Sequence, residues 1–155
     1  MADPTLEQRL EQDIKDALLS GDKTRATTLR GLKAVLLNVK VAQGKRDSGL
    51  NDDEVTQVLA RESKKRQESA DLYKQGEGND SSRAEAELTE KAIIDAYLPA
   101  QLSEEEITGL VDEAIAQTGA SGPQGMGQVI GQVKAKAGAG ADGALIARIA
   151  REKLQ

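Results

Sequence analysis

The sequence contains no cysteine, histidine, phenylalanine or tryptophan. These absences exclude disulfides, Cys/His zinc sites, thiol nucleophiles, Ser-His-Asp triads and any imidazole acid or base. A chain without disulfides suits a reducing compartment, and residues 1–4 lack the basic start and apolar run of a signal peptide. We therefore expect a cytoplasmic protein.

The sequence also lacks a long hydrophobic run, and its mean hydropathy is -0.51. A membrane-spanning helix needs about 20 consecutive apolar residues, so we expect no membrane association. There are 21 Lys and Arg against 26 Asp and Glu, which gives a net charge of -5. This balance argues against a general nucleic-acid coat, which is normally basic overall, but it allows a local basic face.

The remaining composition favours helices. The chain has 155 residues, enough for one ordinary domain or two small ones. Aromatic residues make up only 1% of it, so a core must be built from Leu, Ile, Val and Ala. Because strand-forming residues are scarce, we predict an all-α fold.

Capping patterns divide the chain into helices. Four polar residues are each followed three positions later by Glu or Gln, as at a helix N-terminus: Thr5 with Gln8, Asn51 with Glu54, Ser82 with Glu85, and Ser103 with Glu106. Pro123 and Asp142 indicate two further starts, and Gly21 with Asp22 separates the first two helices. The pattern predicts helices at about residues 5–20, 22–43, 52–75, 82–97, 103–118, 124–137 and 142–154.

Pro99 marks the predicted domain boundary. It lacks an amide proton and biases Leu98 away from helical geometry. We therefore predict an amino-terminal four-helix domain over residues 1–98, followed by a smaller three-helix domain over residues 99–155.

The expected third helix carries charges within its apolar face. At about 100° per residue, the middle of that face falls on Glu62 and Arg66. One interpretation is an intrahelical salt bridge at a place where the bundle opens to solvent. The other is a polar pocket or partner-docking site with Lys33 and Lys40 of the second helix as neighbours, because buried charges without partners are costly.

The expected sixth helix has a row of small residues, Gly127, Gly131 and Ala135, beside its apolar stripe. Each glycine inside a helix costs about 1 kcal/mol relative to alanine, so the row suggests that another backbone approaches closely. That backbone is either a packed helix or a nucleic-acid strand. The glycine spacing does not match the dinucleotide-binding fingerprint, and no strand is expected before it.

Basic residues concentrate near the carboxy terminus. The four candidates for contacts with phosphate groups are Lys134, Lys136, Arg148 and Arg151. Arg148 and Arg151 fall on one outward row of the last expected helix, where phosphates could be met. Plain solvation of a basic surface is the alternative interpretation.

Four short motifs together resemble the YqeY-like family. They are residues 97–106 (YLPAQLSEEE), 125–131 (GMGQVIG), 141–143 (ADG) and 61–66 (RESKKR). The resemblance covers essentially the whole chain and implies an amino-terminal helical domain followed by a smaller one. The smaller domain is similar to the tail of the B subunit of glutamine-dependent aminoacyl-tRNA amidotransferase. Where the family often has a charged residue in the glycine run, this sequence has Gln124 and Gln128.

The resemblance implies a tRNA-contacting module, because amidation in that enzyme belongs to other domains and to a separate subunit. It supplies no catalytic residue, so we expect no metal, no cofactor and no intrinsic ATPase, glutaminase or amidotransferase activity. The first hypothesis is a non-catalytic RNA-interaction module, with tRNA or a protein of the aminoacylation or amidotransfer machinery as partner. The second is a protein adaptor, or an accessory to carbon-nitrogen ligase chemistry carried by other subunits. An enzyme using Glu62 as acid or base is the weakest hypothesis, because histidine and dense carboxylate motifs are absent.

The domain prediction can be checked by limited proteolysis. Proteases cut exposed connections first, so we expect early cleavage between Leu98 and Ser103 or within residues 76–81. Mass spectrometry of the fragments locates the cuts. A substantial β-sheet signal in circular dichroism would contradict the all-α prediction.

Overall fold

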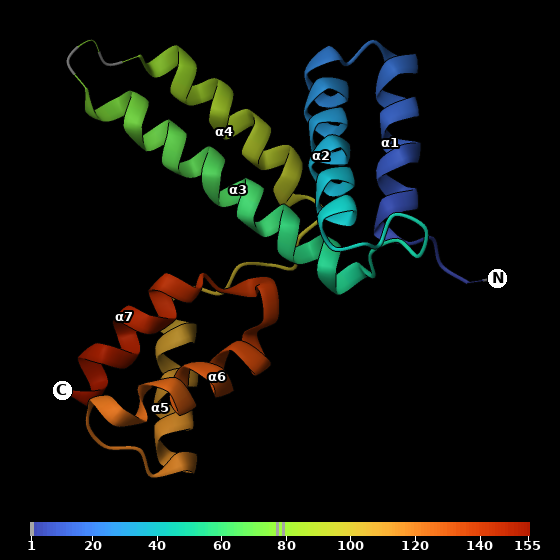
Figure 1. The fold of residues 1–155 in the computed structure, drawn as a ribbon. Coiled ribbons are helices and arrows are strands. Elements are labelled where there is room, and N and C mark those ends of the chain that lie inside the picture. Colours follow the sequence, from blue (N-terminus) through green and yellow to red (C-terminus); the bar gives the residue numbers. More distant parts are fainter. Residues whose placement is uncertain (1, 77, 79) are drawn as a thin grey trace. The chain divides into compact units, whose positions relative to one another are not determined.

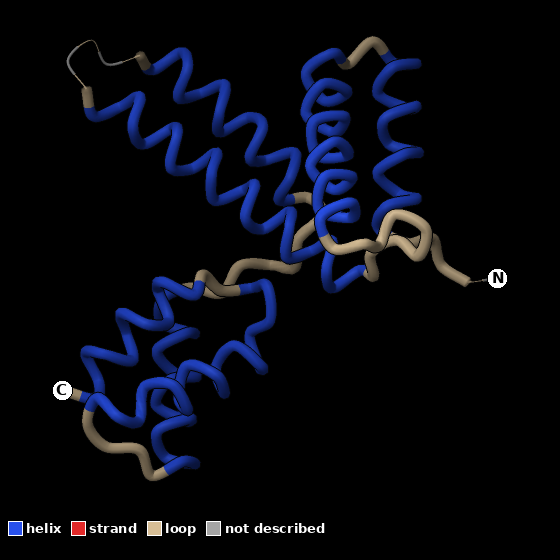
Figure 2. The backbone as a smooth tube through the Cα atoms, in the orientation of Figure 1, coloured by secondary structure: helices blue, strands red, loops and turns tan. Residues whose placement is uncertain are grey.

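The computed structural model describes residues 2–76, 78 and 80–155, and all regular structure within them is helical (Figures 1 and 2). The helices are α1 (Leu6–Ser20), α2 (Lys23–Ala42), α3 (Asp52–Gln75), α4 (Ser81–Asp95), α5 (Glu104–Thr118), α6 (Met126–Ala137) and α7 (Gly143–Leu154). Two single 3-10 turns, η1 (Pro123–Gly125) and η2 (Gly138–Gly140), flank α6. The all-α prediction is confirmed.

Most helix starts lie where the capping pattern predicts them. The Thr5 hydroxyl accepts from the backbone amide of Gln8, and the Gln8 side chain accepts from the Thr5 amide. Asn51 and Ser103 cap α3 and α5 in the same position. Gly21 ends α1 with a φ of 77°, a left-handed conformation that suits glycine.

The predicted cap of α4 is wrong by two residues. The helix begins at Ser81, and the carboxylate of Asp80 accepts from the amide of Arg83 at 3.0 Å. Ser82 therefore lies inside the first turn. Aspartate caps a helix as well as serine does, so the earlier residue satisfies the free amide first. Of the segment 76–81, residues 77 and 79 lie outside the described residues.

Contacts divide the chain into two units, residues 1–98 and 99–155. In the first unit, α1 and α2 form one antiparallel hairpin and α3 and α4 form another (Figure 1). The two hairpins share one aliphatic core. Its buried members are Leu10, Leu29, Leu32, Leu36, Leu50, Val55, Val58, Leu59, Ile94 and Tyr97.

Tyr97 fixes the end of α4 against the first hairpin. Its hydroxyl donates to the carboxylate of Asp13, and the guanidinium of Arg9 lies 4.7 Å from its ring centre. Arg25 of α2 approaches the same carboxylate at 3.7 Å. Burial, followed by the hydrogen bond to Asp13, raises the pKa of the Tyr97 hydroxyl above its ordinary value, so the phenol stays neutral and remains a donor.

The second unit is a bundle of α5, α6 and α7 with its own core. The buried residues are Ile107, Val111, Ala114, Val129, Val133, Ile146, Ile149, Ala150 and Leu154. The amide of Leu102 donates to the carbonyl of Gly140 at 2.7 Å, which joins the start of the unit to the turn before α7. Among the described helices, none is both long and apolar enough to cross a bilayer.

The cap assignment of α4 is open to test. Asp80→Ala removes the side chain that satisfies the first turn, and we expect it to lower the free energy of unfolding by about 1 kcal/mol. Ser82→Ala, inside the helix, should change it by less than about 0.5 kcal/mol. Urea denaturation of the two variants measures both values. A larger loss of unfolding free energy in Ser82→Ala than in Asp80→Ala would show that Ser82 is the cap.

Candidate functional site

The interrupted apolar face of α3 holds a buried ion-pair network. Glu62 is only 5% exposed, and its carboxylate contacts Nη1 of Arg66 at 3.3 Å and Nζ of Lys65 at 3.0 Å. Nε of Arg66 also contacts Oε2 of Glu90 on α4 at 2.9 Å, with Glu87 at 3.9 Å. The intrahelical salt bridge therefore exists, but its carboxylate lies inside the α3–α4 pair and not where the bundle opens to solvent.

A second polar chain runs beside this network. The hydroxyl of Ser63, also buried, donates to Asp95 of α4, whose other oxygen contacts Nζ of Lys91 at 2.6 Å. Every carboxylate named in the ion-pair network and in this second set of contacts thus has a cationic or hydroxyl partner. Such an arrangement pairs two helices in one register and offers no open coordination position. Within the described part of the chain, no group of three or more acidic side chains is placed to hold a metal ion.

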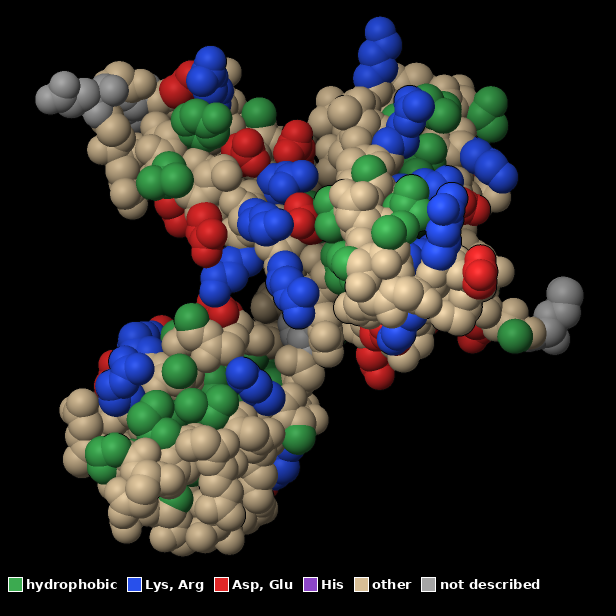
Figure 3. Space-filling model, viewed as in Figure 1, with side chains coloured by type: hydrophobic (Ala, Val, Ile, Leu, Met, Phe, Trp, Pro, Cys, Tyr) green, Lys and Arg blue, Asp and Glu red, His purple; other side chains and the backbone are tan. Residues whose placement is uncertain are grey.

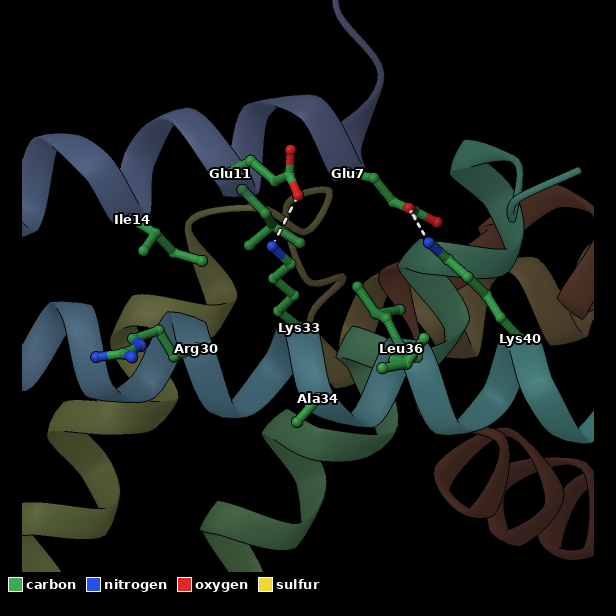
Figure 4. A pocket seen from close by; sticks show the side chains of 10 residues that line it. Glu7, Glu11, Ile14, Arg30, Lys33, Ala34, Leu36 and Lys40 are labelled. Atoms are coloured by element: carbon green, nitrogen blue, oxygen red, sulfur yellow. Dashed lines mark hydrogen bonds and ion pairs between the residues drawn. The ribbon is translucent and has the colours of Figure 1, made fainter. Parts of the chain in front are cut away.

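Lys33 and Lys40 do not join this network. They face α1 instead, where Nζ of Lys33 contacts Oε1 of Glu11 at 2.8 Å and Lys40 pairs with Glu7 (Figure 4). The hydrogen bond and charge of Lys33 hold the pKa of the Glu11 carboxyl below its ordinary range. The predicted polar site thus divides into two separate sets of ion pairs, because these lysines face α1 whereas Arg66 faces α4.

The glycine row of α6 faces open space. Gly127 and Gly131 are exposed, and a Cβ atom added at either position would meet no atom within 4 Å. Within the described residues, no helix packs on these two glycines, so the row does not serve helix packing inside this chain. Lys134 continues the same row at i+7 from Gly127, and its side chain passes close to Gly143 at the start of α7.

Two of the four candidate cations of α6 and α7 are already paired with carboxylates of α5. Lys136 contacts Glu113 at 2.5 Å, and Arg148 contacts Glu104 at 2.9 Å. The hydrogen bond to Glu104, followed by one to Glu152, raises the pKa of the Arg148 guanidinium. Within the described residues, Lys134 and Arg151 form no ion pair, so the predicted set separates into two compensated and two uncompensated cations.

Sequence reasoning missed the acidic partners. The α5 carboxylates lie 23 and 44 residues from the cations they meet, which leaves no local pattern. Glu87 and Glu90, which meet Arg66, carried a weak signal because they share one face of α4 at i and i+3. Figure 3 shows acidic and basic side chains intermixed over the visible face of residues 1–98.

Comparison with protein families matches residues 7–154 to the family model described as Yqey-like protein. A search of curated proteins finds no match to the chain.

The buried network predicts a stability difference between two arginines of α3, Arg66 and Arg61. Arg66→Ala leaves Glu62 buried with one largely exposed partner, Lys65, so we expect a loss of about 2–3 kcal/mol in the free energy of unfolding. This is below the range of about 3–5 kcal/mol for fully buried pairs, because a quarter of the Arg66 side chain is exposed. Arg61→Ala is the matched control, since Arg61 is exposed, and should cost less than about 0.5 kcal/mol. Equal losses in chemical denaturation would show that the network contributes nothing specific.

Proposed function

Because the chain belongs to the YqeY-like family, we propose that it is a non-catalytic RNA-interaction module, related to tRNA, that contacts RNA through residues 99–155. The proposal rests on the similarity of this part of the sequence to the amidotransferase B-subunit tail, together with the surface of α6. The chain itself performs no amidation in this proposal. It acts alone or beside a protein of the aminoacylation or amidotransfer machinery.

The single observation that carries the proposal is the uncovered row formed by Gly127, Gly131 and Lys134. Two helical glycines weaken α6 by about 2 kcal/mol relative to alanine, and none of the helices that the structure describes packs against them in return. A nucleic-acid backbone approaching this row would meet a flat surface of main chain that ends in an ammonium group. Lys and Arg contacts to phosphates need no particular sequence motif, so one cation at the end of a smooth row suffices to begin such a contact.

The remaining cations differ in how readily they can reach phosphate. Arg151 is exposed and pairs with no carboxylate among the residues that the structure describes, whereas Arg148 must exchange Glu104 and Glu152 for a phosphate. Exposed ion pairs are worth about 0–1 kcal/mol, so this exchange is feasible. Arg148 and Lys136 therefore support binding as secondary contacts, and Lys134 and Arg151 as primary ones.

The pairing of Lys136 and Arg148 with α5 also favours a second candidate, a protein adaptor. Their charges are offset, and the whole chain carries a net charge of -5, which disfavours a polyanion. In the adaptor function, the small-residue row would receive a helix of a partner protein, since small residues allow two helix backbones to approach closely. RNA titration separates the two candidates.

We expect purified tRNA to bind with an affinity that falls with salt at a log-log slope of about -3, for four single-strand contacts at roughly -0.7 each. Arg151→Ala should make that slope shallower by roughly 0.7, the value for one phosphate contact. Arg148→Ala should change the slope by less, because the charge of Arg148 is already offset by carboxylates. Fluorescence titration at several salt concentrations measures both. The two arginines form a matched pair on one helix.

Gly131→Leu tests the row without changing charge. It should abolish tRNA binding by bulk, while thermal melting stays at or above that of the wild type because no neighbour is crowded. Unchanged tRNA affinity in Gly131→Leu and Arg151→Ala would remove the RNA proposal and favour the adaptor.

A further inference from the structure

The outer face of the α1–α2 hairpin carries two parallel rows of side chains. Each row follows the helical spacing i, i+4, i+7 and i+11, which places its members along one side of the helix. The α1 row is Glu7, Glu11, Ile14 and Leu18, and the α2 row is Arg30, Ala34, Leu37 and Val41. Between the rows lies a groove of about 390 Å³, whose floor includes Leu10 and Leu36.

This face exposes apolar surface. Leu18, Leu37 and Val41 are 55%, 47% and 57% exposed, and they are three of the five large hydrophobic side chains that are exposed among the described residues. Leu37 lines the groove, whereas Val41 lies beyond one end of it and Leu18 beyond the other, so the apolar surface extends along the face.

The charges along the groove are separated by helix. The charged residues that α1 contributes to the lining are carboxylates, Glu7 and Glu11, whereas α2 contributes the cations Arg30, Lys33 and Lys40. The two lysines pair with the two carboxylates across the groove (Figure 4). Arg30 forms no ion pair within the described part of the chain, so the basic side has one uncompensated charge.

We propose that this face binds a second copy of the same chain, forming a twofold-symmetric dimer. A twofold axis that runs parallel to the helices, within the interface, lays α1 of one copy over α2 of the other. The carboxylate side then meets the cation side twice, and Arg30 gains the acidic side of the second copy. The other in-plane axis sets α1 over α1 and α2 over α2, so that the carboxylate side of one copy does not meet the cation side of the other. Electrostatic complementarity therefore selects the first arrangement.

The size of the face sets the strength of this dimer. Each row spans about 17 Å at 1.5 Å per residue, and two helices are about 20 Å wide. This footprint is less than half of the roughly 800 Å² per partner that a standard specific interface buries, so the dimer is weak and transient. We therefore expect the dimer to form only at high concentration of the chain, and the chain to be monomeric in dilute solution.

The proposal is tested by sedimentation equilibrium of the full chain, without RNA, from about 5 μM to about 1 mM. The weight-average mass should rise from 16.5 kDa toward twice that value. Leu37→Glu places a charge in the groove and should weaken the association at least about tenfold. Leu72→Glu is the matched control, because Leu72 is 71% exposed on α3 outside both rows, and it should change the association by less than about twofold.

Arg30→Glu tests the charge arrangement separately. It sets a carboxylate against the acidic side of the second copy and should weaken association, whereas Arg61→Glu, on α3, should not. A chain that stays monomeric to about 1 mM overturns the proposal and leaves a helix of another protein as the occupant. Equal effects of Leu37→Glu and Leu72→Glu would also overturn it. Neither result bears on tRNA binding, which uses residues of the other unit.

Discussion

The polar contact between α3 and α4 centres on Arg66, which pairs with Glu62 on its own helix and with Glu90 on α4. The apolar face of α3 is broken at Glu62 and Arg66, so aliphatic packing alone does not determine how α4 lies against it. Arg66 satisfies the buried carboxylate on its own helix and reaches Glu87 and Glu90 on the next one. The contacts of Glu62 lie within α3, and α4 is joined to α3 by the contact of Arg66 with Glu90 and the hydrogen bond of Ser63 to Asp95. These polar contacts act together with the buried aliphatic residues of the two helices, among them Leu59 and Ile94.

The second unit likewise combines an aliphatic core with ion pairs between its helices. Its core is small and aliphatic, and cations of α6 and α7 meet the acidic helix α5 around its edge. These exposed pairs contribute little stability individually, but they determine which cations remain free for another molecule. Lys134 and Arg151 form no ion pair in the part of the chain that the structure describes, and Lys134 lies on the uncovered glycine row. The ion pairs thus shape the candidate RNA surface more than the number of basic residues does.

The two proposals concern different units and can reinforce one another. A dimer formed through α1 and α2 would carry two copies of the α6 row in one particle. Two weak RNA contacts joined in this way bind more tightly than either alone, provided that one RNA molecule spans both. A weak single-site affinity and a weak dimer are then compatible with selective binding at high local concentration of chain and RNA.

Local signals in the sequence determined the helices. Thr5, Asn51 and Ser103 cap helices because a polar side chain followed by Glu or Gln satisfies free amides within one turn. The cap of α4 was misplaced at Ser82 because two acceptable caps lie two residues apart, and only the helix register chooses Asp80. Such choices depend on contacts beyond the turn itself.

The sequence predicted less about the candidate sites than about the helices. It identified Glu62, Arg66 and the α6 glycines as unusual, because each departs from the helical pattern around it. It could not show that Lys33 faces Glu11 or that Arg148 meets Glu104, since those partners lie 22 and 44 residues apart along the chain. Local sequence therefore determined where the helices form and which positions are anomalous. The tertiary structure alone decided which charges are compensated and which faces stay uncovered, because ion pairing and burial depend on distances between helices.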